Sequence, residues 1–116
     1  MGDVTILHNP RCTKSRATLA LLGDHGIEPR IVDYLNEPPS SAELMKILGM
    51  LGFGARALLR TDEPEYRALG LDNEDLAEAD LVTAMCAHPR LIQRPIVVAN
   101  GKAVLGRPPE AILDIL

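Results

Sequence analysis

Aromatic residues are scarce in this sequence, and neither sign of charge dominates it. Among 116 residues there are two tyrosines, one phenylalanine and no tryptophan, so stacking of nucleic-acid bases on aromatic side chains is not expected. Twelve Lys and Arg residues against sixteen Asp and Glu residues give a formal net charge of −4. That balance excludes the general basic surface of a nucleic-acid-binding protein. Any anion-binding site must therefore be local.

Cysteines and long apolar runs are also few. The two cysteines, Cys12 and Cys86, are too few for a disulfide framework. No apolar run approaches the length of a membrane span, and the first residues do not begin a signal peptide. The scattered histidines and distant cysteines lack metal-ligand spacing. We expect a cytoplasmic protein that holds no metal and binds neither membrane nor nucleic acid.

The remaining composition is that of one globular domain. With 116 residues and 47% hydrophobic content, we expect a single α/β domain over residues 1–116. A capping box at Ser40 and Glu43 marks a helix start, and Asn100-Gly101 marks a hairpin turn. The expected order is β-α-β, a helical insert at about 40–90, then β-β-α. Strands are expected over 3–7, 28–34, 96–98 and 103–105, and helices over 13–25, from 41 onward, 55–60, within 74–88 and over 110–116.

The stretch H-N-P-R-C-T-K-S-R over 8–16 carries the chemistry. It places Cys12 between a strand and a helix that starts at about Thr13, where free backbone N–H groups and the helix dipole favour negative charge. The basic side chains nearby are Arg11, Lys14, Arg16 and His8. A free thiol has a pKa of about 8.5, which such a setting lowers. The other reading, a small buried cysteine, is disfavoured because hardly any apolar residue flanks Cys12.

This order of elements, with a thiol after the first strand, resembles the thioredoxin fold in its glutaredoxin branch. The 8–16 motif resembles that of the glutaredoxin-coupled arsenate reductase family, and so do A-R-A-L-L-R at 55–60, Q-R-P-I-V-V at 93–98 and G-R-P-P at 106–109. The resemblance covers nearly the whole chain. It implies a cis peptide bond between Arg94 and Pro95. Where thioredoxins carry C-x-x-C, this chain has Cys12 and Ser15, so no disulfide forms within the motif.

The resemblance also implies a role for each matching residue. Cys12 would be the nucleophile, with His8 and Ser15 helping to lower the pKa of its thiol. The three arginines that would hold the oxyanion are Arg60, Arg94 and Arg107, since guanidinium groups bind tetrahedral oxyanions bidentately. The implied reaction reduces arsenate to arsenite, with glutathione as co-substrate, glutaredoxin as partner and no bound cofactor. The family leads us to expect a monomer.

Other functions remain open at this point. The same thiol would suit a glutathione-dependent thiol transferase acting on protein mixed disulfides. A related branch of the fold binds RNA polymerase, but its redox-sensing members carry C-x-x-C, which Ser15 removes. The phosphatase-like class of arsenate reductase is disfavoured because Cys12 and Arg16 form C-x3-R rather than C-x5-R. Cys86 is interpreted as a packing residue, and Arg56, Arg67 and Arg90 as surface residues.

Overall fold

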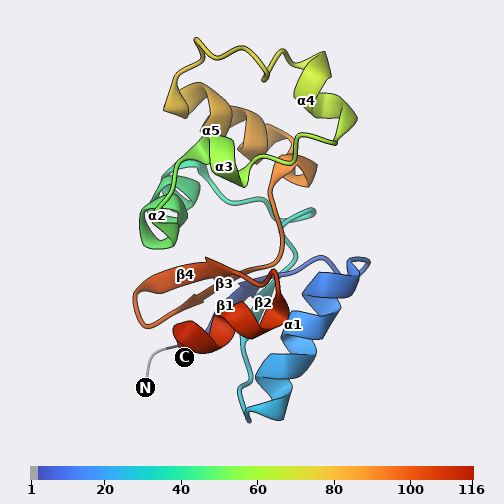
Figure 1. Ribbon diagram of the computed structural model, residues 1–116, viewed down its shortest axis with the longest axis vertical. Helices are drawn as coiled ribbons and strands as arrows, with labels where there is room; N and C mark the ends of the chain where they lie inside the picture. The colour runs from blue at the N-terminus through green and yellow to red at the C-terminus, as the bar shows by residue number, and fades with distance from the viewer. Residues whose placement is uncertain (1–2) are drawn as a thin grey trace. The chain divides into compact units, whose positions relative to one another are not determined.

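The computed structural model describes residues 3–116 and divides into two compact units. One unit is formed by the chain up to Glu37 together with Arg94–Leu116, and the other by Pro38–Gln93. The second unit corresponds to the helical insert expected at about 40–90. Each unit has its own set of elements (Figure 1).

The first unit is built on a four-stranded sheet of order β2-β1-β3-β4. β1 (Thr5–Leu7) pairs parallel to β2 (Arg30–Val32) and antiparallel to β3 (Ile96–Ala99), which pairs antiparallel with β4 (Lys102–Leu105). The β-α-β and β-β parts of the expected order are confirmed. Both N-terminal strands are shorter than expected, three residues each.

The β3–β4 hairpin turns at the expected residues. Asn100 has a φ of 55° and Gly101 a φ of 74°. Two consecutive left-handed residues are what a tight two-residue turn of the type I′ class requires, and Asn-Gly meets that requirement at little steric cost. The turn sets the register of the two strands, in which Ile96 lies opposite Leu105.

Two helical segments pack together on one face of this sheet (Figure 1). α1 (Thr13–Asp24) ends at His25, followed by Gly26 with a φ of 72°. The C-terminal segment, expected as a helix over 110–116, is instead the 3-10 helix η2 (Pro109–Asp114). Its hydrogen bonds run from residue i to i−3, the tighter form that short helices adopt. The buried core between these helices and the sheet consists of Ile6, Leu22, Val97, Ala99, Ile112 and Ile115.

The second unit is helical. Its elements are α2 (Ser41–Leu51), α3 (Ala55–Leu58), α4 (Pro64–Ala68), α5 (Glu78–Ala87) and the 3-10 helix η1 (Pro89–Leu91). The capping box is confirmed, since Ser40 and Glu43 exchange hydrogen bonds at the start of α2. α4 is not among the helices expected from the sequence, and it lies in the polar stretch over 61–70. It forms with Pro64 in its first turn, where the missing N–H has no cost.

Two proline peptide bonds are cis. The bond between Arg94 and Pro95, just before β3, is cis as predicted. The bond between Arg107 and Pro108, just after β4, is also cis. None of the helices within residues 3–116 is long and apolar enough to cross a membrane.

Gly106 is the position where α1 comes nearest to the sheet. A Cβ atom there would lie 2.5 Å from Thr18 Oγ1 and 2.8 Å from Pro95 Cγ. The Gly106 N–H also donates to the Pro95 carbonyl at 2.9 Å. Only glycine allows this approach without displacing α1 or Pro95.

We therefore expect Gly106→Ala to lower the free energy of unfolding by about 1–3 kcal/mol, the usual cost of overpacking. Gly23→Ala is the matched control, because Gly23 is an exposed residue of α1 and its added Cβ would meet no neighbouring atom within 4 Å. That variant should gain up to about 1 kcal/mol from helix propensity. Urea unfolding followed by circular dichroism measures both. Equal stabilities would contradict the close contact at Gly106.

Candidate active site

Cys12 occupies the boundary between the β1 loop and α1. It is the N-cap residue of α1, with extended backbone angles of φ −93° and ψ 124°. A tight turn precedes it, since the Cys12 N–H donates to the Asn9 carbonyl at 3.0 Å and the Arg11 N–H donates to Asn9 Oδ1 at 3.0 Å. Cys12 is half-buried and forms no disulfide. The thiol therefore lies at a helix N-terminus, as the sequence predicts.

The surroundings of Cys12 lower the pKa of its thiol. Burial alone would raise that pKa, but the backbone N–H groups of Ser15 and Lys14 and the positive charge of Arg94 together lower it more. The thiol makes no regular cap hydrogen bond. These N–H groups instead act on the negative charge of a thiolate, as expected for the first turn of a helix. The main charged neighbour is thus Arg94, which comes from the other end of the chain.

Ser15 links the first turn of α1 to the end of β1. Its side chain is completely buried, and His8 is 7% exposed. Ser15 Oγ lies 2.7 Å from His8 Nδ1 and accepts the Asn9 N–H at 3.0 Å. Burial lowers the pKa of His8, against a smaller opposing effect of the negative charge of Asp33. His8 therefore adds less positive charge near neutral pH than an ordinary histidine would, and its contact with Ser15 joins the end of β1 to α1.

The strand register brings Arg94 and Arg107 to the same end of the sheet. Ile96 lies opposite Leu105, and the hydrogen bond from Gly106 to Pro95 extends the pairing by one position. Arg94 and Arg107 are the next residues on their two strands. Leu7 of β1 lies opposite Ile96, so this is also the end at which β1 leads into the Cys12 loop.

The two arginines differ in their surroundings. Arg94 is half-buried, and its Nε is buried without a hydrogen-bond partner in the part of the chain that the structure describes. A buried donor usually has a hydrogen-bond partner, so this unsatisfied donor is an unusual feature of Arg94. Arg107 is exposed.

Thr18 is a residue that the sequence analysis missed. It is completely buried in α1, donates to the Lys14 carbonyl at 2.8 Å, and lies 3.4 Å from the Gly106 carbonyl. It thus joins α1 to the segment that carries Arg107. The available signal was its spacing, three residues after Ser15 on the same face of the helix.

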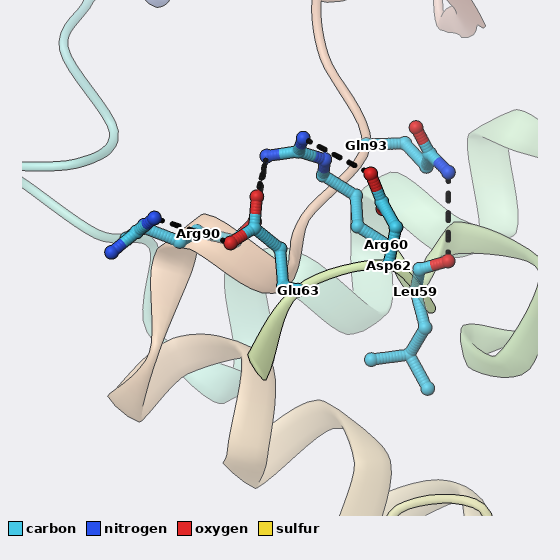
Figure 2. Close-up of polar contacts among 6 residues, drawn as sticks. All are labelled: Leu59, Arg60, Asp62, Glu63, Arg90 and Gln93. Atoms are coloured by element: carbon cyan, nitrogen blue, oxygen red, sulfur yellow. Dashed lines mark hydrogen bonds and ion pairs between the residues drawn. The ribbon is translucent and has the colours of Figure 1, made fainter. Parts of the chain in front are cut away.

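Arg60 lies in the other unit, within a cluster of charged side chains (Figure 2). Its backbone N–H donates to the Leu91 carbonyl at 2.8 Å. Its side chain is 15% exposed and pairs with Glu63, with Nη1 2.7 Å from Oε1. The structure thus brings Cys12, His8, Ser15 and Arg94 together within one unit. It places Arg107 at the same sheet end and Arg60 in the insert.

Cys86 also lies in the insert, half-buried near the end of α5. Burial raises the pKa of its thiol, a nearby hydrogen bond with Ser41 lowers it, and the negative charge of Glu43 raises it. The net direction is upward, opposite to that of Cys12. The two thiols of the chain therefore differ in reactivity, and Cys86 has the character of a packing residue.

Comparison with known proteins places these features in a family context. The ArsC family model matches residues 7–115. An arsenate reductase of Neisseria meningitidis serogroup A is 48% identical over 117 residues, covering 100% of both chains. The uncharacterized protein YfgD of Escherichia coli K12 is 51% identical over 98% of this chain and 97% of its own. A solved arsenate reductase from Vibrio cholerae aligns with a TM-score of 0.96 and 48% identity, over 99% of this chain and 98% of that one.

The charge of Arg94 acting on Cys12 leads to a direct test. Alkylation of Cys12 by iodoacetamide should rise with pH through a midpoint below that of an ordinary thiol, because only the thiolate reacts. Arg94→Ala removes a positive charge and should move the midpoint upward. Arg16→Ala is the matched control: Arg16 is exposed and is not among the groups that lower the Cys12 pKa.

Cys86 is an internal reference for the same measurement. Peptide mapping by mass spectrometry should find Cys12 modified well before Cys86 at neutral pH. Equal rates at the two thiols, or an unchanged midpoint in Arg94→Ala, would show that the first turn of α1 and Arg94 do not stabilise the thiolate.

Proposed function

The chain belongs to the ArsC family, and on this basis we propose that it is an arsenate reductase with Cys12 as its nucleophile. The observation that carries the proposal is the half-buried Cys12 thiol, whose pKa is lowered by the first turn of α1 and by Arg94. The Neisseria and Vibrio relatives are named arsenate reductases, which supports the choice of arsenate. Arsenate is a tetrahedral oxyanion, which guanidinium groups bind well.

We further propose that three arginines hold the oxyanion. Arg94 and Arg107 share one end of the sheet, and the Nε of Arg94 is a buried donor without a hydrogen-bond partner among residues 3–116. Arg60 is assigned by its position in the A-R-A-L-L-R motif, and it remains a prediction that it reaches the same ligand. Positive groups of this kind stabilise the charge that builds up as a thiolate attacks an oxyanion.

In the first step, Cys12 thiolate attacks As(V) and forms a sulfur–arsenic bond, and hydroxide leaves. Glutathione then replaces a second oxygen on arsenic, with loss of water. A glutaredoxin thiolate attacks the glutathione sulfur and forms a mixed disulfide, and the electron pair of the broken bond reduces As(V) to As(III). Hydrolysis releases arsenite and restores Cys12. The chain needs one thiol in this scheme, which agrees with Ser15 where C-x-x-C proteins have a second cysteine.

The scheme requires a reducing compartment, because Cys12 must be a free thiol and glutathione must be available. We propose the cytoplasm, and glutathione and glutaredoxin as co-substrate and partner. His8 and the buried Ser15 act in this scheme as positioning residues, because they tie the Cys12 loop to α1.

A coupled assay tests the proposal. The protein is mixed with glutathione, glutaredoxin, glutathione reductase and NADPH, and arsenate-dependent loss of NADPH is followed. Cys12→Ser should reduce turnover to background, whereas Cys86→Ser should retain it. No turnover from a folded wild type whose Cys12 still alkylates at neutral pH would exclude arsenate as the substrate and favour transfer of glutathione from protein mixed disulfides.

Arg107→Ala separates these two chemistries. Loss of one group that stabilises the oxyanion should lower arsenate turnover by about 10²–10³-fold, while transfer of glutathione from a model mixed disulfide should be nearly unchanged. Arg67→Ala is the control, since Arg67 is an exposed arginine of the insert. Equal losses in both assays for Arg107→Ala would argue against an oxyanion site at this residue.

A further inference from the structure

The side chain of Glu63 does not act on its own helix. Glu63 is the N-cap residue of α4, yet it makes no cap hydrogen bond to that helix. Its carboxylate lies between two guanidinium groups instead (Figure 2). Oε1 is 2.7 Å from Arg60 Nη1, and Oε2 is 3.2 Å from Arg90 Nη2. Each carboxylate oxygen of Glu63 thus contacts one arginine.

The burial of this group shows which contacts matter. The side chains of Glu63 and Arg60 are 11% and 15% exposed, so their interaction is shielded from solvent. Asp62 is also near Arg60, but its side chain is 77% exposed and its carboxylate lies 3.9 Å from Nη2. Exposed pairs at that distance contribute little. Glu63 is therefore the main charged partner of Arg60.

Glu63 binds only one nitrogen of the Arg60 guanidinium, Nη1. Nη1 donates to Glu63 and, at 3.3 Å, to the Arg90 carbonyl, which accounts for both of its hydrogens. In the described residues 3–116, neither Nη2 nor Nε of Arg60 donates a hydrogen bond, and Nη2 makes only the 3.9 Å ion pair with the exposed Asp62. The Nη2–Nε edge is one of the paired-donor edges by which arginine binds an oxyanion bidentately.

We propose that Glu63 is a positioning residue that holds Arg60 by Nη1 and so leaves its Nη2–Nε edge ordered for binding an oxyanion. This inference rests on the proposed role of Arg60 in arsenate binding. Arg90 supports it from the other side, because it shares the negative charge of Glu63. The shared carboxylate then orients Arg60 while neutralising only part of its charge.

A competing role for Glu63 would have the opposite consequence. If the carboxylate blocked the anion site, removing it would strengthen binding and lower KM for arsenate. If Glu63 positions Arg60, removing the carboxylate leaves the Arg60 side chain mobile. Arsenate binding must then order that side chain, so KM rises. The separate nitrogens used by Glu63 and available to the anion favour positioning.

The test measures kcat and KM for arsenate in Glu63→Ala and Glu63→Gln. We expect KM to rise about tenfold in Glu63→Ala with kcat little changed, because an equally weakened ground state and transition state affect KM alone. Glu63→Gln keeps an acceptor oxygen and should restore KM to within about threefold of wild type. The matched control is Glu65→Ala, the loss of a half-buried glutamate inside α4. A lower or unchanged KM in Glu63→Ala would overturn the inference.

A second measurement separates this inference from the assignment of arsenate reduction. The Nε–H signal of Arg60 in ¹⁵N NMR, assigned with Arg60→Lys, should show slow guanidinium rotation in wild type and fast rotation in Glu63→Ala. Adding arsenate should shift that signal in wild type and much less in Glu63→Ala. An inactive wild type that shows both effects would refute arsenate reduction and support the positioning role. Active wild type with fast Arg60 rotation would refute positioning alone.

Discussion

A reactive thiolate at Cys12 depends on keeping the first turn of α1 at the end of β1 and β3. The N–H groups that stabilise the thiolate belong to α1, whereas the charge that assists them belongs to Arg94, at the start of β3. Their alignment rests on the contact of Thr18 with Gly106 and on the hydrogen bond between Gly106 and Pro95. A small displacement of the helix would separate the thiolate from its stabilising groups, because these interactions weaken steeply with distance.

The proposed oxyanion site requires an acidic protein to concentrate positive charge locally, and two arginines of this chain are shielded from solvent in different ways. Arg94 is partly removed from water, with a buried Nε that lacks a partner within residues 3–116. Arg60 is also shielded, but it is held by a carboxylate that a second arginine shares. Burial strengthens the field of both guanidinium groups, since less solvent screens them. If both side chains bind the oxyanion as proposed, restricting their motion beforehand would lower the entropic cost of binding.

Much of the fold follows from local sequence signals. The capping box at Ser40 and the Asn100-Gly101 turn depend on contacts within a few residues. They therefore form in the same way in different tertiary surroundings. The misread segments lack such signals. α4 is a five-residue helix in a polar stretch, and the C-terminal segment adopts a 3-10 form. The choice between α, 3-10 and loop in segments this short depends on packing more than on intrinsic preference.

The candidate site also has features that the sequence predicts and features that only the tertiary structure shows. The sequence alone determined that Cys12 caps a helix, because strand, turn and helix signals lie within a few residues of one another. The motifs also drew attention to His8, Ser15 and the three arginines. Only the tertiary structure decided that the pKa of His8 is lowered and that Arg94 is the main cation acting on Cys12. It also decided that Thr18 contacts Gly106 and that Glu63 pairs with Arg60. Those properties arise from burial and from contacts between distant segments, and neither is encoded in the spacing of residues along the chain.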